Sequence, residues 1–308
     1  MSLDKNEISD WFKSLQDDIC QSLEIADGSA KFQTDNWNRE EGGGGRSRII
    51  QNGSVIEKGG VNFSAVYGEL PENIKKALKV DGNQFFATGV SIVIHPINPF
   101  VPIIHMNVRY FEIINPDDEN RGAKKTCWFG GGIDLTPHYV FENDAQFFHK
   151  SLKNACDKFD ATYYPEFKKW ADDYFYINHR NETRGIGGIF FDRLTENEKF
   201  SIENRFEFVK EVGLTFAPVY TKYMDLHKND SFSDENKQWQ MLRRGRYVEF
   251  NLVYDKGTKF GLDTNGRIES ILMSLPPLAS WLYDFKPKSD SKEQHTLNLL
   301  KKDITWVS

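Results

Sequence analysis

The order of two hydrophobic patterns along the chain is the feature that most limits its fold. Segments rich in Val, Ile, Phe and Tyr recur in the first half, bounded by Pro, Asn or Gly, and this composition predicts β-strands. From residue 142 to residue 176 the apolar residues instead recur about every 3.6 positions, which predicts two consecutive helices. Strands joined by hairpins, with helices in separate runs, favour an α+β fold in which helices cover a largely antiparallel sheet. The strands predicted in the first half are residues 46–50, 89–95, 105–114 and 126–129.

The helical period also predicts three further helices. Apolar residues follow it from residue 4 to residue 27 and stop at Gly28, which marks a helix end. A long helix is predicted for residues 198–228, with Pro218 as the place where it would kink. Residues 297–307 are predicted to close the chain as a helix.

The last part of the chain contains a further pattern typical of strands. Residues 246–254 alternate along their length, residues 255–257 form a turn signal, and Asn265-Gly266 is a hairpin signal before residues 268–275. These patterns predict a strand meander. Residues 185–191 are predicted as another short, glycine-rich strand.

Length, charge and cysteine use limit the class of protein. The chain has 308 residues and a formal net charge of −6, which argues against a nucleic-acid partner because phosphates require a basic excess. There is no internal repeat and no long linker, so one domain spanning residues 1–308 is predicted. The first residues are acidic where a targeting peptide would be basic, and no apolar run has the length of a membrane span. Three cysteines without CxxC spacing fit a reducing compartment, so we expect a cytoplasmic protein.

Arginines gather beside glycines, although the chain is acidic overall. Guanidinium groups bind carboxylates through paired hydrogen bonds, so this arrangement suits a ligand with many carboxylates. For any one arginine the alternative is an ordinary ion pair at the surface. The arginines concerned are Arg46, Arg48, Arg180, Arg184, Arg243, Arg244, Arg246 and Arg267.

Four consecutive glycines occupy residues 42–45, between Trp37 and Arg46. No Gly-Lys-Ser/Thr follows them, so nucleotide binding is not supported. We expect a mobile loop that leads into a strand. It serves either as a lid that closes over a ligand or as a plain connection.

Two candidates for catalysis lie at predicted strands. Asp134 follows three glycines at which a backbone can approach a ligand closely, although an Asp before Thr-Pro is also a normal turn residue. His105 has the same strand parity as Asn107 and Arg109. This parity would place a proton carrier, an amide and a cation on one face.

The histidines suggest a metal hypothesis. Neutral imidazoles bind divalent ions, but the chain lacks HxH and HExxH pairs, so acid–base or structural roles are the alternative. The histidines concerned are His95, His105, His149 and His179.

Six segments of the chain resemble the oxygen-dependent coproporphyrinogen III oxidase family. They follow one another in the family's order, and the resemblance extends from about residue 36 to residue 285. The segments are NREEGGGGRSR (38–48), HMNVRYF (105–111), WFGGGIDLTP (128–137), KWADDYFY (169–176), HRNETRGIGG (179–188) and RRGRYVEFNLV (243–253).

This resemblance implies a flat antiparallel sheet sandwiched between helices, and a homodimer whose contact includes residues 247 to about 282. It also implies an enzyme that converts two propionates of the tetrapyrrole coproporphyrinogen III to vinyl groups, giving protoporphyrinogen IX in haem biosynthesis. Molecular oxygen accepts the electrons, carbon dioxide leaves, and no organic cofactor takes part. Two other classes of function stay open: a non-haem iron or manganese oxygenase that uses the histidines, and a tetrapyrrole carrier without catalysis.

The resemblance also implies roles for individual residues. His105 matches the proposed proton donor, and Asp134 resembles the acid that faces the pyrrole nitrogens. Arg109 or Arg267 would hold the reacting propionate. The four histidines named above match metal ligands proposed for some bacterial members. Positions that match substrate contacts are Ser91, Asn107, Val108, Arg109, Asn265, Gly266 and Arg267.

Overall fold

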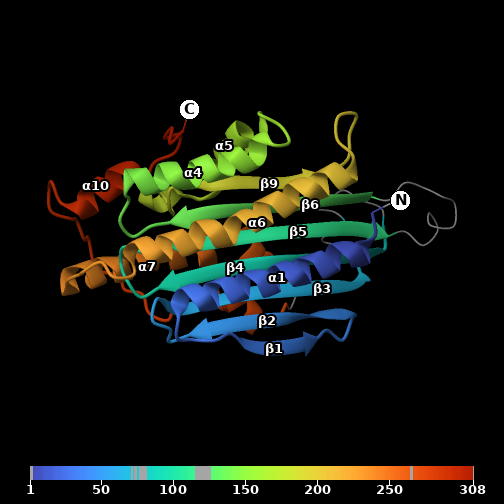
Figure 1. Ribbon diagram of the computed structural model, residues 1–308, viewed down its shortest axis with the longest axis horizontal. Coiled ribbons are helices and arrows are strands. Elements are labelled where there is room, and N and C mark those ends of the chain that lie inside the picture. The colour runs from blue at the N-terminus through green and yellow to red at the C-terminus, as the bar shows by residue number, and fades with distance from the viewer. Residues whose placement is uncertain are drawn as a thin grey trace.

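The computed structural model describes residues 3–70, 72, 75, 82–114, 126–263 and 266–307. A seven-stranded antiparallel sheet crosses the molecule in the order β1-β2-β3-β4-β5-β6-β9 (Figure 1). Its strands are β1 (Gln33–Asn38), β2 (Gly43–Gln51), β3 (Ile56–Glu69), β4 (Gln84–Pro96), β5 (Ile103–Ile114), β6 (Thr126–Thr136) and β9 (Gly188–Leu194). A small second sheet pairs β7 (Tyr176–Ile177) with β8 (Glu182–Thr183). The helices are α1 (Lys5–Asp27), α4 (Glu142–Asp157), α5 (Tyr163–Tyr174), α6 (Ile202–His227), α7 (Asp234–Val253), α8 (Lys256–Asp263), α9 (Ile268–Leu272) and α10 (Lys292–Leu299). The predicted α+β fold class is confirmed.

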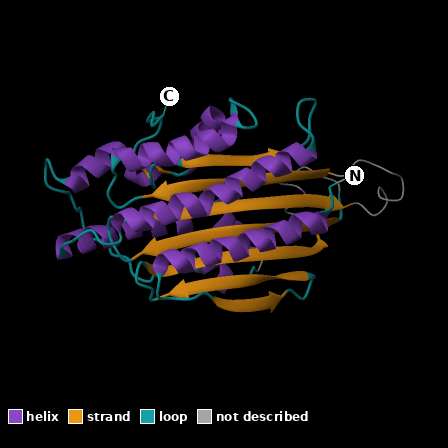
Figure 2. Ribbon diagram, viewed as in Figure 1, coloured by secondary structure: helices purple, strands orange, loops and turns teal. Residues whose placement is uncertain are grey.

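The two faces of the large sheet have different helical partners. Side chains alternate along a strand, and in β5 the side chains of Met106 and Val108 are fully buried in the main core with residues of α1 and α6. Figure 2 shows these two helices running across this face of the sheet. Tyr247 of α7 packs instead with Val93 and Ile103, which have the opposite parity. The sheet therefore lies between helices on both faces.

The face that α7 partly covers also carries polar side chains. Residues that pair directly across antiparallel strands point to the same face, so the register brings the predicted site residues together. We call this surface of β4, β5 and β6 the polar face. Its register pairs are Ser91 with Asn107, His105 with Asp134, Asn107 with Gly132, and Arg109 with Gly130.

Most predicted elements are confirmed. The opening helix ends at Asp27, and Gly28 follows in a left-handed conformation with φ 79°. The confirmed helices at residues 142–176 and 198–228 are α4, α5 and α6, and the predicted strands at residues 89–95, 105–114, 126–129 and 185–191 lie within or overlap β4, β5, β6 and β9.

The glycine run is not the mobile loop that the sequence predicted. Gly44 and Gly45 lie in β2 and pair with both β1 and β3. Gly43 begins this strand with φ 80°, and a Cβ there would lie 2.2 Å from the carbonyl oxygen of Ala65. Glycine is therefore needed for a tight β1–β2 hairpin, and this hairpin replaces both the lid and the plain connection.

The predicted strand meander is wrong. Residues 246–254 complete α7 and its C-cap, and residues 268–275 contain α9. Ser233 begins α7 through a capping box with Asn236. Polar residues occupy part of the buried face of this helix, so the apolar residues alone do not mark which face is buried. The apolar and polar residues that remain alternate locally, as they would in a strand. These buried residues include Arg243, Arg244 and Asn251 beside Tyr247 and Phe250.

The closing helix lies earlier than predicted. Ser291 caps α10, which ends at Leu299, so residues 300–307 are not helical. Leu300 and Trp306 are nevertheless buried in the main core. The apolar pattern of this segment thus reflects packing and not a helical period.

Asp27 joins the end of α1 to the turn between β2 and β3. Its carboxylate accepts hydrogen bonds from the backbone N–H groups of Ser54 (3.1 Å), Val55 (2.9 Å) and Ile56 (2.8 Å). A Cβ at Gly53 would lie 2.3 Å from Asp27 Oδ1, so the turn needs glycine at this position. Burial raises the pKa of Asp27, but the backbone donors outweigh it and lower the pKa to about 2.

Replacing Asp27 by Asn should therefore destabilise the protein in a pH-dependent way. A carboxylate whose pKa is lower in the folded state stabilises the fold at pH values above the pKa of the unfolded chain. This stabilisation is lost as the pH falls to the pKa of the folded state. We expect Asp27→Asn to lower the free energy of unfolding by about 2 kcal/mol at pH 7, and the difference from wild type to shrink between about pH 4 and pH 2. Urea unfolding over this range measures it, with Asp10→Asn at an exposed position of α1 as the control. A difference that is constant with pH would contradict this account.

Candidate active site

The polar face has a floor of glycine backbone with side chains around it and over it. Gly130 and Gly132 of β6 have no side chain to raise above the sheet. Asp192 and Arg109 fill the space above Gly130, and the ring of Phe190 lies close to the space above Gly132, so both glycines are buried beneath side chains. The partly exposed side chains around this floor belong to Ser91, His105, Asn107 and Arg109.

Val108, a predicted substrate contact, points the other way. Its side chain is fully buried in the main core, on the face that α1 and α6 cover. Only its backbone could meet a ligand on the polar face.

Asp134 connects His105 to a buried arginine. Asp134 Oδ1 lies 2.8 Å from His105 Nδ1, and Oδ2 accepts a hydrogen bond of 2.6 Å from Arg184 Nη2. The side chains of Asp134 and Arg184 are each 2% exposed, whereas His105 is 24% exposed. Burial raises the pKa of Asp134, but the charge of Arg184 and the bond to His105 outweigh it, so the pKa lies below its ordinary value. Asp134 is therefore a charged group that orients the imidazole of His105 and leaves Nε2 as the nitrogen available to a ligand.

Arg184 is held by α7 as well as by Asp134. Its guanidinium donates to Asn251 Oδ1 at 2.9 Å. It also lies over the rings of Phe175, Tyr247 and Phe250, at 4.3, 4.9 and 4.7 Å from their centroids. The sequence grouped Arg184 with arginines that could bind a ligand, and its burial corrects that interpretation.

Arg109 stands beside the glycine floor. It donates to Asn107 Oδ1 at 2.7 Å and to Asp192 Oδ1 at 3.0 Å. Asp192, on β9, is a site residue that sequence reasoning missed. The only sequence signal for it was strand parity with Phe190, which pairs with Gly132 and so lies on the polar face.

Arg267 reaches the same face from the start of α9. Its Nη1 donates to Ser270 Oγ at 3.1 Å and to Ser47 Oγ at 3.4 Å, and its Nη2 pairs with Asp35. Successive register pairs run from Ser47 through Asn62 and Ser91 to Asn107. Ser47 is thus three strand spacings from β5, about 14 Å. Two guanidinium groups therefore flank the polar face.

Gly266 precedes Arg267, and its N–H donates to the Gly261 carbonyl at 2.7 Å. The backbone of Gly266 is therefore tied to α8. Asn265, also a predicted substrate contact, lies outside the described residues.

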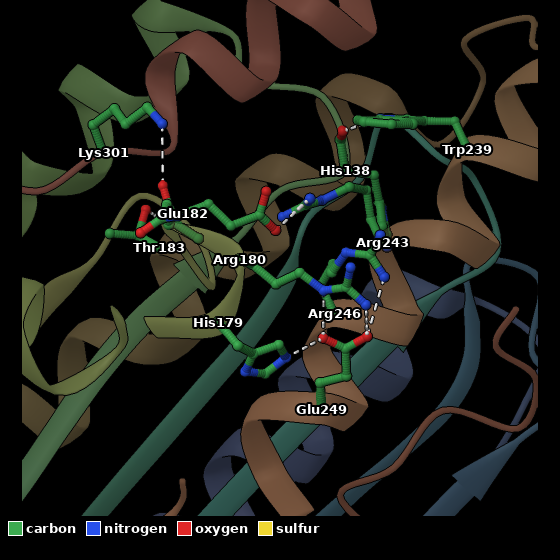
Figure 3. A network of polar contacts seen from close by, with 12 residues as sticks. His138, His179, Arg180, Glu182, Thr183, Trp239, Arg243, Arg246, Glu249 and Lys301 are labelled. Carbon is green, nitrogen blue, oxygen red and sulfur yellow. Dashed lines mark hydrogen bonds and ion pairs between the residues drawn. The ribbon is translucent and has the colours of Figure 1, made fainter. Parts of the chain in front are cut away.

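The other arginines, like Arg109, Arg184 and Arg267, are paired with acids of the chain itself, but they lie outside β4, β5 and β6. Figure 3 shows His179, Arg180 and Arg246 directed at Glu249. Burial raises the pKa of Glu249, but its basic partners and Trp281 lower it to about 2. The remaining pairs are Arg243 with Glu182, Arg244 with Glu57, and Arg46 and Arg48 with Asp17. These contacts favour the ion-pair alternative over ligand binding for this group.

The four histidines do not meet at one metal site. In the described part of the chain, no three His, Cys, Asp or Glu side chains are arranged to hold a metal ion. Burial lowers the pKa of His95 and of His149 to about 3, so both are neutral. Both nitrogens of His149 and Nε2 of His95 have partners within the protein, whereas Nδ1 of His95 is buried without one among the described residues. The contacts are His95 with the Ser274 carbonyl, His105 with Asp134, His149 with Tyr164 and the Ile186 carbonyl, and His179 with Tyr254 and Glu249. This arrangement does not fit a bound metal.

The fold and the site together describe a class of protein in which one face of an antiparallel sheet presents an Asp-oriented histidine and an arginine, an arrangement suited to an anionic ligand. Among the described helices, none is both long and apolar enough to cross a bilayer.

Comparison with known proteins identifies the family. The family model described as Coproporphyrinogen III oxidase matches residues 7–306. An oxygen-dependent coproporphyrinogen-III oxidase of Glycine max, described as chloroplastic, is 51% identical over 302 residues, which cover 96% of this chain and 77% of the relative. The enzyme of the same name from Drosophila melanogaster is 50% identical over 303 residues (95% and 76%), and that from Prochlorococcus marinus is 46% identical over 318 residues (96% and 88%). The chain belongs to the coproporphyrinogen III oxidase family.

The buried pair of Asp134 and Arg184 predicts a strong effect on stability. Arg184→Met leaves the Asp134 charge buried without its main partner and should lower the free energy of unfolding by about 4 kcal/mol. Urea unfolding measures this loss. Adding Asp134→Asn to Arg184→Met should recover part of it, because the uncompensated charge is then gone. Equal stability of wild type and Arg184→Met would contradict the assignment.

Proposed function

We propose that this chain catalyses the oxygen-dependent conversion of coproporphyrinogen III to protoporphyrinogen IX, a step of haem biosynthesis. The proposal rests on family membership and on the names of the curated relatives. The observation that carries it in the structure is the polar face, where His105, Asp134 and Arg109 surround a floor of glycine backbone. A porphyrinogen has carboxylates at its rim, which suit Arg109, and a ring that can lie over the side chains of such a face.

Each of the two oxidations balances without an organic cofactor. A propionate side chain, R–CH₂–CH₂–COO⁻, reacts with O₂ and one proton to give R–CH=CH₂, CO₂ and H₂O₂. The carbon–carboxylate bond breaks, its electron pair forms the vinyl double bond, and a hydrogen with its two electrons passes from the β-carbon to oxygen. The protein must hold the carboxylate, supply the proton and exclude water.

The arrangement of His105 and Asp134 suggests which group supplies the proton that each oxidation consumes. Because His105 Nδ1 faces Asp134, Nε2 can deliver a proton to reduced oxygen at the polar face. The sequence suggested that Asp134 itself faces the pyrrole nitrogens. With 2% exposure and both oxygens bound, Asp134 acts in our proposal through His105. The Arg184→Met/Asp134→Asn double variant lacks the charge that orients His105. We therefore expect its kcat to be about 100-fold lower than that of wild type, even where the second substitution recovers part of the stability.

Substrate carboxylates need cations at the edges of the face. Arg109, four residues from His105 on the same strand and face, is placed to hold the reacting propionate, and Arg267 to hold a second carboxylate. Ser91 and Asn107 offer hydrogen bonds between them. The backbone of Gly266 positions Arg267, and Val108 contributes only main-chain atoms.

Aerobic conversion of coproporphyrinogen III by chelator-treated protein tests this function. Products are oxidised and separated by fluorescence chromatography, with an anaerobic reaction as control. We expect protoporphyrin only in air. Activity that disappears after chelation and returns with iron or manganese would favour the metal-oxygenase alternative, and binding without turnover would favour a carrier.

We propose a homodimer as the active assembly. Large apolar side chains are exposed along the segment for which the resemblance implied a dimer contact, and such a patch is typical of an interface. Tyr247, its first residue, is buried within the chain. The exposed residues include Leu252, Val253, Phe260, Ile268, Leu278, Trp281, Leu282 and Tyr283.

Sedimentation should give the mass of two chains. Leu282→Asp should shift the mass toward one chain, whereas Leu214→Asp, at an equally exposed site of α6, should leave it unchanged. A single-chain mass for wild type would reject the dimer.

We also propose that residues 1–308 act as one domain in the cytoplasm. One core contains both Ile8 and Trp306, which supports a single folding unit. Cys20, Cys127 and Cys156 form no disulfide within the described part of the chain, as suits a reducing compartment, and cell fractionation tests this location.

A further inference from the structure

A second acid on the polar face lies against Arg109. The two contacts of this guanidinium, with Asn107 and Asp192, use two of the five N–H donors of an arginine. The Arg109 and Asp192 side chains are 36% and 34% exposed, respectively. A carboxylate that approaches Arg109 along the polar face therefore also approaches Asp192.

An irregularity in β9 aims Asp192 at Arg109. The register of β6 and β9 shifts between Phe129 and Gly131, so two residues of β9, Asp192 and Arg193, lie opposite Gly130. A bulge of this kind redirects a side chain. Arg193 takes φ 51°, a left-handed conformation that costs free energy for a residue other than glycine. The strand thus departs from regular geometry where it presents Asp192.

Gly130 provides the space for this ion pair. A Cβ on Gly130 would lie 2.4 Å from Asp192 Oδ1 and 2.9 Å from Arg109 Nη2. The two charged groups therefore lie directly over the backbone of β6. An alanine at this position would displace them without changing their charges.

The proposed reaction changes the charge next to Arg109. A bound propionate neutralises the guanidinium before the reaction. After that carboxylate has left as CO₂, the guanidinium faces an uncharged vinyl group beneath a ligand that excludes water, and an unpaired charge in such surroundings is unfavourable. Asp192 is a counter-charge that the reaction does not consume.

We propose that Asp192 is a positioning residue that acts through Arg109. It fixes the guanidinium over Gly130 and weakens its hold on the substrate carboxylate, so that this carboxylate can leave. The inference rests on the proposed function, because it needs a carboxylate that departs. Without the Asp192 charge, Arg109 stabilises the bound propionate more than the transition state, in which the carboxylate charge is being lost.

Two variants separate the charge of Asp192 from its geometry in steady-state conversion of coproporphyrinogen III in air. Asp192→Asn keeps a hydrogen-bond acceptor and removes the charge, so KM and kcat should both fall, each about 5-fold. Gly130→Ala keeps the charge and displaces the pair, so KM should rise about 5-fold while kcat changes less. A structural defect would not lower KM.

The matched control is Glu211→Gln on α6, on the opposite face of the sheet. Glu211 is 28% exposed and pairs with Lys158 at 2.5 Å, so this variant also removes one carboxylate charge from an ion pair. Its kinetic constants should equal those of wild type. An Asp192→Asn enzyme with unchanged or raised KM, or with unchanged kcat, overturns the proposal. If the wild-type protein does not convert coproporphyrinogen III, the proposed function is rejected, and the proposed role of Asp192 is rejected with it.

Discussion

Arg184, buried between Asp134 of β6 and Asn251 of α7, joins the sheet to the helix on its polar face. Two charges this deeply buried are favourable only when their other hydrogen-bonding groups also have partners. His105, Asn251 and the surrounding aromatic rings provide much of this compensation. The position of α7, the ring orientation of His105 and the charge at the centre of the site thus depend on one another.

Side chains alternate between the two faces of the sheet, so the residues of the core and the residues of the candidate site lie on opposite faces. In β5, Met106 and Val108 supply the core on one face, while His105, Asn107 and Arg109 are partly exposed on the other. Any slip of one residue in the register would exchange these two sets. The long, paired strands on both sides of β5 make such a slip costly, so the core fixes the geometry of the site.

Local patterns were enough to predict α1, most of the sheet and the common face of His105, Asn107 and Arg109, because period and parity are properties of neighbouring residues. The partners of these groups were not predictable in this way. Arg184 is 50 residues from Asp134, and Asp192 is 83 residues from Arg109. The end of α7 was misassigned because its buried face includes the polar Asn251 beside Tyr247 and Phe250, so hydrophobicity does not follow burial over residues 246–254.

The glycine floor has a further consequence for the entropy of binding. Gly130 and Gly132 are held by strand pairing, so their backbone freedom is lost when the sheet forms and not when a ligand arrives. They also have no rotamers to immobilise. A ligand bound at the polar face would therefore order side chains such as Arg109 and not the backbone beneath them, which has the same shape before and after binding.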